Sequence, residues 1–165
     1  MIGKGVFNLV FILSVAGVAG QPGFNQTVFY SVMASGNTVD IDRQLSLLKG
    51  AGLPEKKAYE GALLMRKAGM VKKAKDKLSL FKAGRSLLET SIGADNDNTE
   101  YRFLRLIIQE HAPAIVQYRN KIEQDSRWIQ ANFKHLSPLL QQQVIDYSKK
   151  SKVLKTPVYN FLSHE

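Results

Sequence analysis

Cysteine is absent from the 165 residues of the chain, and histidine is scarce. The missing cysteine excludes a disulfide scaffold, thiol catalysis, a cysteine-ligated zinc or iron–sulfur centre, and a lipid anchor on an N-terminal cysteine. The three histidines, His111, His135 and His164, are too widely spaced to share a zinc ion on one helix. We therefore expect no metal and no cofactor, and a fold that rests on its apolar core.

Proline, glycine and strand patterns are also limited. Five prolines and twelve glycines are too few for a collagen-like or proline-rich chain. No segment alternates apolar and polar residues as half-buried strands do, and no catalytic signature is present. Apolar residues nevertheless make up 44% of the chain, which is enough to build a core. The expected fold class is all-α.

Only one long apolar run is present, near the N-terminus. Residues 6–18 are mostly apolar, Lys4 precedes them, residues 19–20 are small, and residues 21–23 break a helix. This order is typical of a secretory signal peptide. We predict that residues 1–20 are cleaved off and that the mature chain is soluble, exported, and periplasmic or extracellular, with no transmembrane segment. The alternative is a retained anchor, but about 13 apolar residues are fewer than the roughly 20 that span a bilayer.

The remaining chain repeats the apolar spacing of helices. We predict five or six helices that form a bundle or a short solenoid in one domain over residues 37–150. An arm or short helix is expected over residues 21–36, and a loosely ordered basic tail over residues 151–165. The expected helices span about residues 38–49, 54–68, 71–92, 99–110, 113–133 and 138–149. Apolar spacing places Leu78 on the core side of the helix over 71–92 and Ile115 on the core side of the helix over 113–133.

Two details refine this prediction. Gly61 lies inside an expected helix beside Ala58 and Ala62, where glycine normally costs about 1 kcal/mol. We interpret it as a point where another helix approaches closely. The segment 99–110 is apolar nearly all round, which places it in the middle of the bundle.

The rhythm of short helices and turns resembles the tetratricopeptide-type helical repeat proteins. Residues 58–62, 80–84 and 95–101 carry this resemblance, although the roughly 34-residue period of that family is missing. The chain also resembles small exported all-helical proteins of the Bacteroidetes type, through residues 101–106 followed by Gln109-Glu110. These resemblances imply an exported helical protein and imply no activity.

Basic residues gather in one stretch of a chain whose net charge is +9. Residues 66–85 contain eight basic residues and a single acid, Asp76. Such a stretch is either a solvated helix face or a binding site for anionic lipid or acidic polysaccharide. No nucleic-acid motif accompanies it, so nucleic acid is not an expected partner. The candidate anion-binding residues are Lys72, Lys73, Lys75, Lys77 and Lys82.

A second polar feature is the stripe formed by Arg102, Arg105 and Gln109 on the most apolar predicted helix. Buried arginines need partners. The structural interpretation is ion pairing across the bundle, with the candidate partners Glu60, Glu89 and Glu123. The functional interpretation is a forked grip on a carboxylate or a peptide terminus in a groove.

The sequence therefore leaves two classes of function open, and an enzyme of unknown class stands third. We favour a non-catalytic interaction module that holds a protein or peptide in a groove between helices, with the arginine stripe as its candidate ligand-binding residues. The alternative is an anion-binding surface protein that works through the basic stretch. No residue is assigned a catalytic role.

Overall fold

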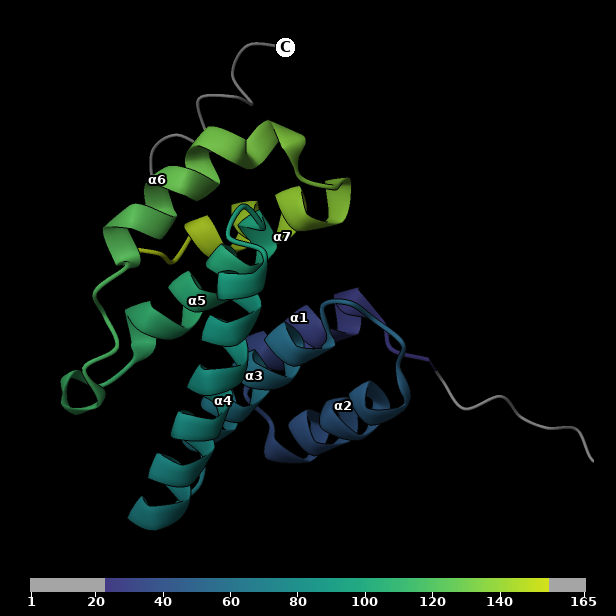
Figure 1. The fold of residues 1–165 in the computed structure, drawn as a ribbon, viewed down its shortest axis with the longest axis vertical. Helices are drawn as coiled ribbons and strands as arrows, with labels where there is room; N and C mark the ends of the chain where they lie inside the picture. The colour runs from purple at the N-terminus through teal and green to yellow at the C-terminus, as the bar shows by residue number, and fades with distance from the viewer. Residues whose placement is uncertain (1–22, 155–165) are drawn as a thin grey trace, which may run out of the picture.

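The computed structural model describes residues 23–154, which are entirely helices and connecting turns, without strands (Figure 1). This confirms the predicted all-α class. The predicted signal peptide and residues 155–165 of the predicted tail lie outside the described residues. The α-helices are α1 (Gln26–Ser35), α2 (Thr38–Gly50), α3 (Lys56–Ala68), α4 (Ala74–Ala94), α5 (Thr99–His111), α6 (Ile122–Asn132) and α7 (Pro138–Ser148), with short 3-10 helices η1 (Ala114–Val116) and η2 (Phe133–His135).

Side-chain caps begin four of these helices, because the first backbone N–H groups of a helix have no partner inside it. The α1 and α5 caps are Asn25 and Asn98, and Ser137 caps α7 with Pro138 directly after it. The α2 cap is Asn37, whose side chain accepts from two backbone N–H groups, so Thr38 is the first residue of the helix.

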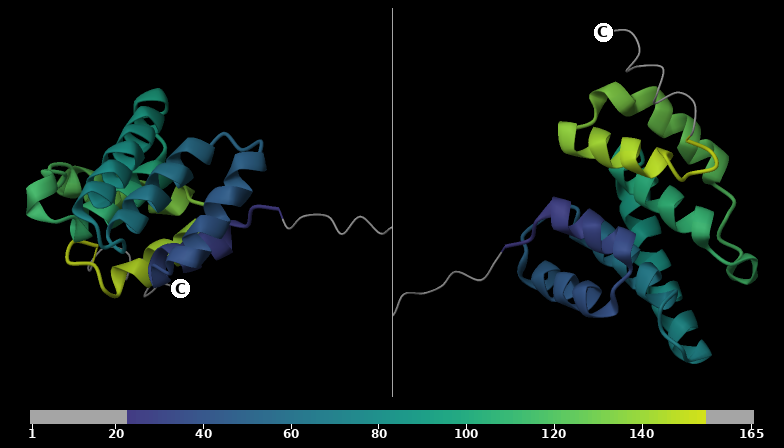
Figure 2. Two further views of the ribbon diagram at one scale, coloured as in Figure 1. Left: turned by 90° about the horizontal axis from the view of Figure 1, so that it is seen from below. Right: turned by 180° about the vertical axis from the view of Figure 1, so that it is seen from behind.

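Helix α4 is the longest helix of the described residues, and the other helices are arranged along it (Figures 1 and 2). Helices α1, α2 and α3 lie on one side of it, and α5, α6 and α7 gather toward its C-terminal half. Its 21 residues exceed the 13 of α3 and of α5, so its first turns extend past these neighbours. Residues 74–79 are accordingly exposed. The described part of the chain, residues 23–154, has no helix long and apolar enough to cross a membrane.

The predicted close approach at Gly61 is confirmed, and its partner is Gly84 of α4. A Cβ atom on Gly61 would lie 2.6 Å from the Gly84 carbonyl oxygen, and a Cβ on Gly84 would lie 2.5 Å from that of Gly61. The two backbones therefore touch, which no residue larger than glycine allows without a shift. Helix α5 is largely buried in the bundle, as its composition predicted.

The expected helix over residues 113–133 is wrong in its first third. Pro113 has an extended backbone, the 3-10 helix η1 follows, and Gln117 then adopts a left-handed conformation with φ of 47°. Helix α6 begins only at Ile122. Ile115, which the pattern assigned to the core, is 89% exposed.

Two further expectations need correction. Leu78 was expected on the core side of the basic helix, yet it is 50% exposed because it lies on the projecting turns of α4. The tail is not loose over residues 151–154, where Ser151 and Leu154 are buried. The Glu110 carboxylate holds this segment, accepting from the Ser151 hydroxyl at 2.8 Å and from the Lys152 backbone N–H at 3.0 Å.

Candidate functional site

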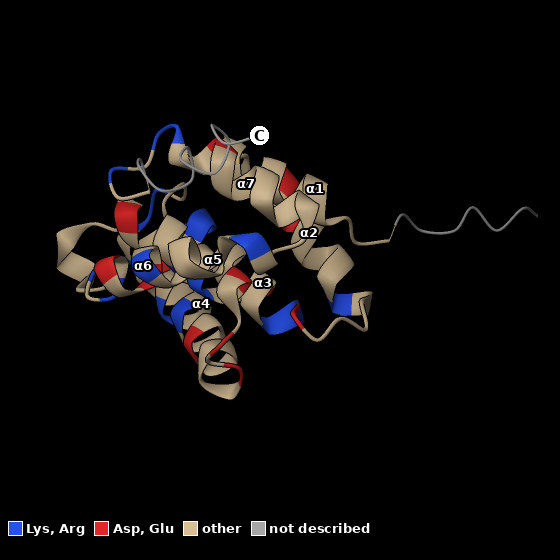
Figure 3. Ribbon diagram, turned by 90° about the horizontal axis from the view of Figure 1, so that it is seen from above, with Lys and Arg blue, Asp and Glu red and all other residues tan. Residues whose placement is uncertain are grey.

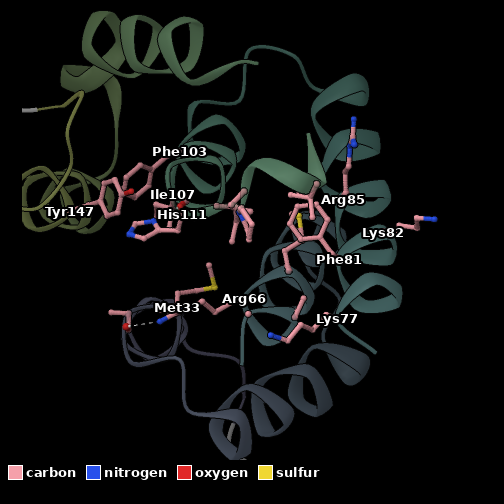
Figure 4. A pocket seen from close by; sticks show the side chains of 18 of the residues that line it. Met33, Arg66, Lys77, Phe81, Lys82, Arg85, Phe103, Ile107, His111 and Tyr147 are labelled. Atoms are coloured by element: carbon pink, nitrogen blue, oxygen red, sulfur yellow. Dashed lines mark hydrogen bonds between the residues drawn. The ribbon is translucent and has the colours of Figure 1, made fainter. Parts of the chain in front are cut away.

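A groove of about 790 Å³ lies where α4, α5 and α7 diverge, and α1 and α3 complete its wall (Figure 4). Large apolar side chains from five helices face it. They are Met33 of α1, Met65 of α3, Phe81 of α4, Phe103 and Ile107 of α5, and Tyr147 of α7. Phe103 and Tyr147 make an edge-to-face contact with ring centroids 5.7 Å apart. The lining is therefore a continuous apolar surface assembled from residues far apart in the sequence.

The charges around this groove are mostly positive. Five cationic side chains and one carboxylate, Asp146, line it. Asp146 is already engaged: Lys149 Nζ donates to its Oδ1 at 2.6 Å, and this hydrogen bond lowers the pKa of the carboxyl group. The cationic residues are Arg66, Lys77, Lys82, Arg85 and Lys150.

These cations differ in what they already contact. Arg66 donates from Nε to the Met33 carbonyl at 2.8 Å and so closes the C-terminal end of α1. Arg85 lies over the Tyr118 ring at 4.8 Å. Lys77 extends toward the groove, whereas Lys82 extends away from it (Figure 4). Within residues 23–154, no hydrogen bond or ion pair engages the Lys77 ammonium. Lys150 lies over the Tyr147 ring at 5.8 Å, so among the described residues Lys77 is the groove cation that extends inward without a polar or ring contact.

The five predicted anion-binding lysines do not form one site. Lys72 and Lys73 precede α4, and Lys75, Lys77 and Lys82 lie on it. All five are exposed, and only Lys77 and Lys82 line the groove. Figure 3 shows basic residues along α4 and on the neighbouring α3 and α5. The basic stretch is thus an exposed strip that reaches the groove through Lys77 and Lys82.

The predicted arginine stripe lies elsewhere, inside the bundle. Arg105 donates from Nε and Nη2 to the two oxygens of Asp125, at 2.7 and 2.8 Å, and from Nη1 to Glu89 Oε2 at 2.8 Å. The expected partner Glu89 is therefore correct. The stronger partner, Asp125 of α6, was missed, and neither Glu60 nor Glu123 forms an ion pair within residues 23–154.

Arg102 shares the Asp125 carboxylate at 3.3 Å, and it also donates to the Asn96 carbonyl oxygen at 2.9 and 2.7 Å. Its guanidinium stacks over the Trp128 ring at 4.3 Å. Gln109 is fully buried, and its Oε1 accepts from the Lys121 backbone N–H at 3.1 Å. None of these three side chains lines the groove.

Ionisation of this network follows from its contacts. Burial alone would lower the pKa of the Arg105 guanidinium, but its hydrogen bonds and the negative charges of Asp125 and Glu89 raise that pKa overall. Glu89 also accepts from the Tyr118 hydroxyl at 2.5 Å, and burial together with that carboxylate raises the pKa of Tyr118. The two arginines bind carboxylates of α4 and α6, so the structural interpretation of the stripe fits its geometry.

A second buried carboxylate, Glu100 of α5, was not identified from the sequence. Its Oε1 accepts from Gln26 Nε2 at 2.7 Å, Tyr30 Oη at 2.8 Å and Tyr59 Oη at 2.9 Å. Burial raises the pKa of Glu100, and the three hydrogen bonds oppose that rise. Tyr30 also lines the groove, so this cluster fixes α1 against α3 and α5 at the groove's edge.

The described part of the chain, residues 23–154, holds no cluster of three or more His, Cys, Asp or Glu residues suited to a metal ion. The groove offers apolar contact and positive charge, which suit binding. In comparisons with known proteins, no family model, no curated protein and no solved structure matches the chain.

Proposed function

We propose that this protein is an exported, non-catalytic binding module whose groove holds an elongated ligand with an apolar body and a negatively charged end. A long-chain carboxylate is the simplest ligand of this class. The observation that carries the proposal is the pairing of a continuous apolar lining with Lys77, whose ammonium extends toward it without a partner in the described chain. A volume of about 790 Å³ falls in the range of roughly 300–1,000 Å³ that is usual for small-molecule sites.

The two parts of the groove would contribute differently. Transfer of each methylene of an acyl chain from water to the apolar wall contributes about 0.8 kcal/mol. Loss of translational and chain freedom offsets a large part of that gain. The ammonium of Lys77 would favour a negatively charged end group over a neutral one. Its contribution to affinity would be small, because an exposed ion pair contributes only about 0.2–1 kcal/mol. Affinity should therefore depend on chain length, and discrimination between an acid and a neutral lipid should depend on Lys77.

Titration of the full chain with tetradecanoate, and with the neutral tetradecanol, tests this proposal by calorimetry or by displacement of a fluorescent fatty acid. We expect the carboxylate to bind more tightly than the alcohol. Lys77→Gln should remove most of that difference and leave the affinity for the alcohol unchanged. Lys75→Gln is the matched control, because Lys75 is also exposed on α4 but does not line the groove.

Residues 1–20 are the same in all these variants, so any amphiphile bound by that apolar segment cancels in the comparison. Ile107→Ser, in the groove wall, should weaken both ligands, with thermal melts to confirm that the variant folds. Equal affinity for acid and alcohol, together with no effect of Lys77→Gln, would refute the assigned role of Lys77. If Ile107→Ser binds both ligands with unchanged affinity, the groove is not their binding site.

We also propose that the chain is exported and loses residues 1–20. Support comes from the order of Lys4, the apolar residues 6–18 and the small residues before position 21. Mass spectrometry of the protein from an envelope or culture fraction should give a chain that starts near Gln21. A mature chain that retains Met1 would remove the claim of cleavage.

The second candidate function is an anion-binding surface on the exposed lysine strip. The observation in its favour is that Lys72, Lys73 and Lys75 are all exposed and make no ion pair within residues 23–154. Binding to heparin should then fall steeply with salt. Gln substitutions at Lys72, Lys75 and Lys82 should weaken it more than substitutions at Lys149, Lys150 and Lys152. Equal losses from both sets would show that only net charge matters.

A further inference from the structure

Two exposed aliphatic side chains from separate segments lie on the lining of the groove. Leu78 of α4 is 50% exposed and Ile115 of η1 is 89% exposed, and both line the groove. Sequence patterns assigned both to the core, so neither exposure follows from local helix periodicity. Single exposed aliphatic residues are common on protein surfaces, but these two lie at the edge of an apolar groove, and apolar surface that is continuous with a groove is typical of a binding site.

Exposed lysines adjoin Leu78 in the sequence, and two of the basic residues of α4, Lys77 and Lys82, line the groove. Lys72, Lys73, Lys75 and Lys77 precede Leu78 in a run of residues that are all exposed, and Asp76 is the one acid among them. Lysine ammonium groups on flexible stems suit a diffuse negative surface, because they need no fixed partner geometry. The strip therefore complements a layer of anionic head groups.

We propose that the opening of the groove docks on the anionic surface of a lipid bilayer, with Leu78 and Ile115 entering the interfacial region and the lysine strip facing the head groups. This inference rests on the proposed function, since it explains how an amphiphile would pass between a leaflet and the groove without crossing water. Interfacial protein segments combine this pairing of basic and apolar side chains.

A protein partner fits the same surface less well. The centre of a protein interface is typically a well-packed patch enriched in aromatic residues. The side chains exposed at this opening are two aliphatic residues separated by a groove, with lysines around them. Lysine is depleted in such interfaces, whereas anionic lipid attracts it.

The absence of cysteine makes a site-specific test straightforward, because one introduced cysteine is the only thiol. Ile115→Cys and Leu78→Cys, each carrying an environment-sensitive fluorophore in the full chain, would be mixed with phosphatidylcholine vesicles with or without phosphatidylglycerol. We expect a blue shift with the anionic vesicles only, and its loss at high salt. Val39→Cys is the matched control: Val39 is a 69% exposed aliphatic residue on α2 and does not line the groove.

A second arm tests the lysines. Lys72→Gln with Lys75→Gln should weaken vesicle binding of the labelled Ile115→Cys chain roughly tenfold or more, whereas Lys49→Gln with Lys57→Gln should change it by less than about twofold. An equal blue shift at positions 39, 78 and 115 would show non-specific adsorption and overturn the docking proposal. The absence of a blue shift at positions 78 and 115 with anionic vesicles would overturn the docking proposal too, even if the same surface were found to bind an acidic protein.

The two proposals fail separately. Vesicle docking without tetradecanoate binding would refute the proposed function and leave the docking surface in place. Tetradecanoate binding that depends on Lys77, without a blue shift at either label, would refute the docking surface and leave the groove function in place.

Discussion

The sharpest consequence of the buried network concerns Arg105→Ala. The substitution removes three hydrogen bonds of 2.7 to 2.8 Å at once, two to Asp125 and one to Glu89. Asp125 has no exposed surface, and it would keep only the 3.3 Å contact from Arg102. Breaking a buried ion pair from one side costs about 3–5 kcal/mol, because the remaining charge stays buried. For a domain stable by about 5–15 kcal/mol, that is a large part of the total.

Arg102→Ala should be milder. Asp125 would retain both short hydrogen bonds from Arg105, so its charge stays compensated. The losses are the bonds to Asn96, the 3.3 Å bond to Asp125 and the stacking on Trp128, which together amount to about 1–3 kcal/mol. Arg43→Ala is the matched control, since Arg43 is exposed on α2 and forms no ion pair within residues 23–154. It should change the free energy of unfolding by less than about 0.5 kcal/mol.

Urea unfolding of the full chain, followed by far-ultraviolet circular dichroism, measures these differences. With an m-value of about 1–3 kcal/mol/M, Arg105→Ala should lower the midpoint by more than about 1 M while the m-value stays the same. Adding Asp125→Asn to Arg105→Ala should restore part of the loss, because the unpaired carboxylate is then neutral. The reasoning is refuted if the free energy of unfolding of Arg105→Ala lies within about 1 kcal/mol of that of the parent. It is also refuted if Asp125→Asn destabilises the Arg105→Ala chain as much as it destabilises the parent.

Two further predictions concern packing and pH. Gly61→Ala should destabilise by about 1–3 kcal/mol, because its Cβ would meet backbone atoms of α4 at 2.6 and 2.8 Å. Gly93→Ala, in the same α4 but with open space around it, should instead stabilise by up to about 1 kcal/mol; thermal melts that move in the same direction for both would contradict the close contact. Burial raises the pKa of Glu100 above 4.5 in the folded state, so the native state binds the extra proton and the contribution of Glu100 to stability falls as pH rises through that raised pKa. The free energy of unfolding of Glu100→Gln should therefore rise relative to that of the parent as pH increases across this window. A difference that stays constant in urea melts at a series of pH values would contradict this prediction.

Helix class and most helix boundaries could be predicted, because they depend on local spacing and on caps. The segment 113–121 could not, for a physical reason. Ile115, Tyr118 and Ile122 recur at helical spacing, yet the extended backbone of Pro113 and the left-handed Gln117 interrupt the helix. Tyr118 reaches the core from a non-helical turn and Ile115 does not. Apolar spacing alone does not distinguish these two outcomes.

The arginine network was half predictable. A stripe of arginines on an apolar helix indicates buried partners, and Glu89 was among the candidates. Asp125 was available as a signal, since it falls between Ile122 and Ile129 on the side of α6 expected to face the core, where an acid requires a cation. A groove between helices was expected with the arginine stripe in it, but the position and lining of the groove could not be predicted, because its wall depends on how five helices diverge in space.

Helix α5 contributes residues to both the arginine network and the groove. At 100° per residue, the network residues Arg102, Arg105 and Gln109 lie on nearly the opposite side of α5 from the groove residues Phe103 and Ile107. The network ties α5 to α4 and α6 from behind, through Glu89 and Asp125. Residues of α4 and α5 also line the groove, so the placement of these two helices depends partly on an ion pair whose residues lie outside the groove lining. An apolar groove tends to close on itself when empty, because closure buries its lining. The ion pairs on the far side of α5 oppose that closure only by fixing where α5 lies against α4 and α6.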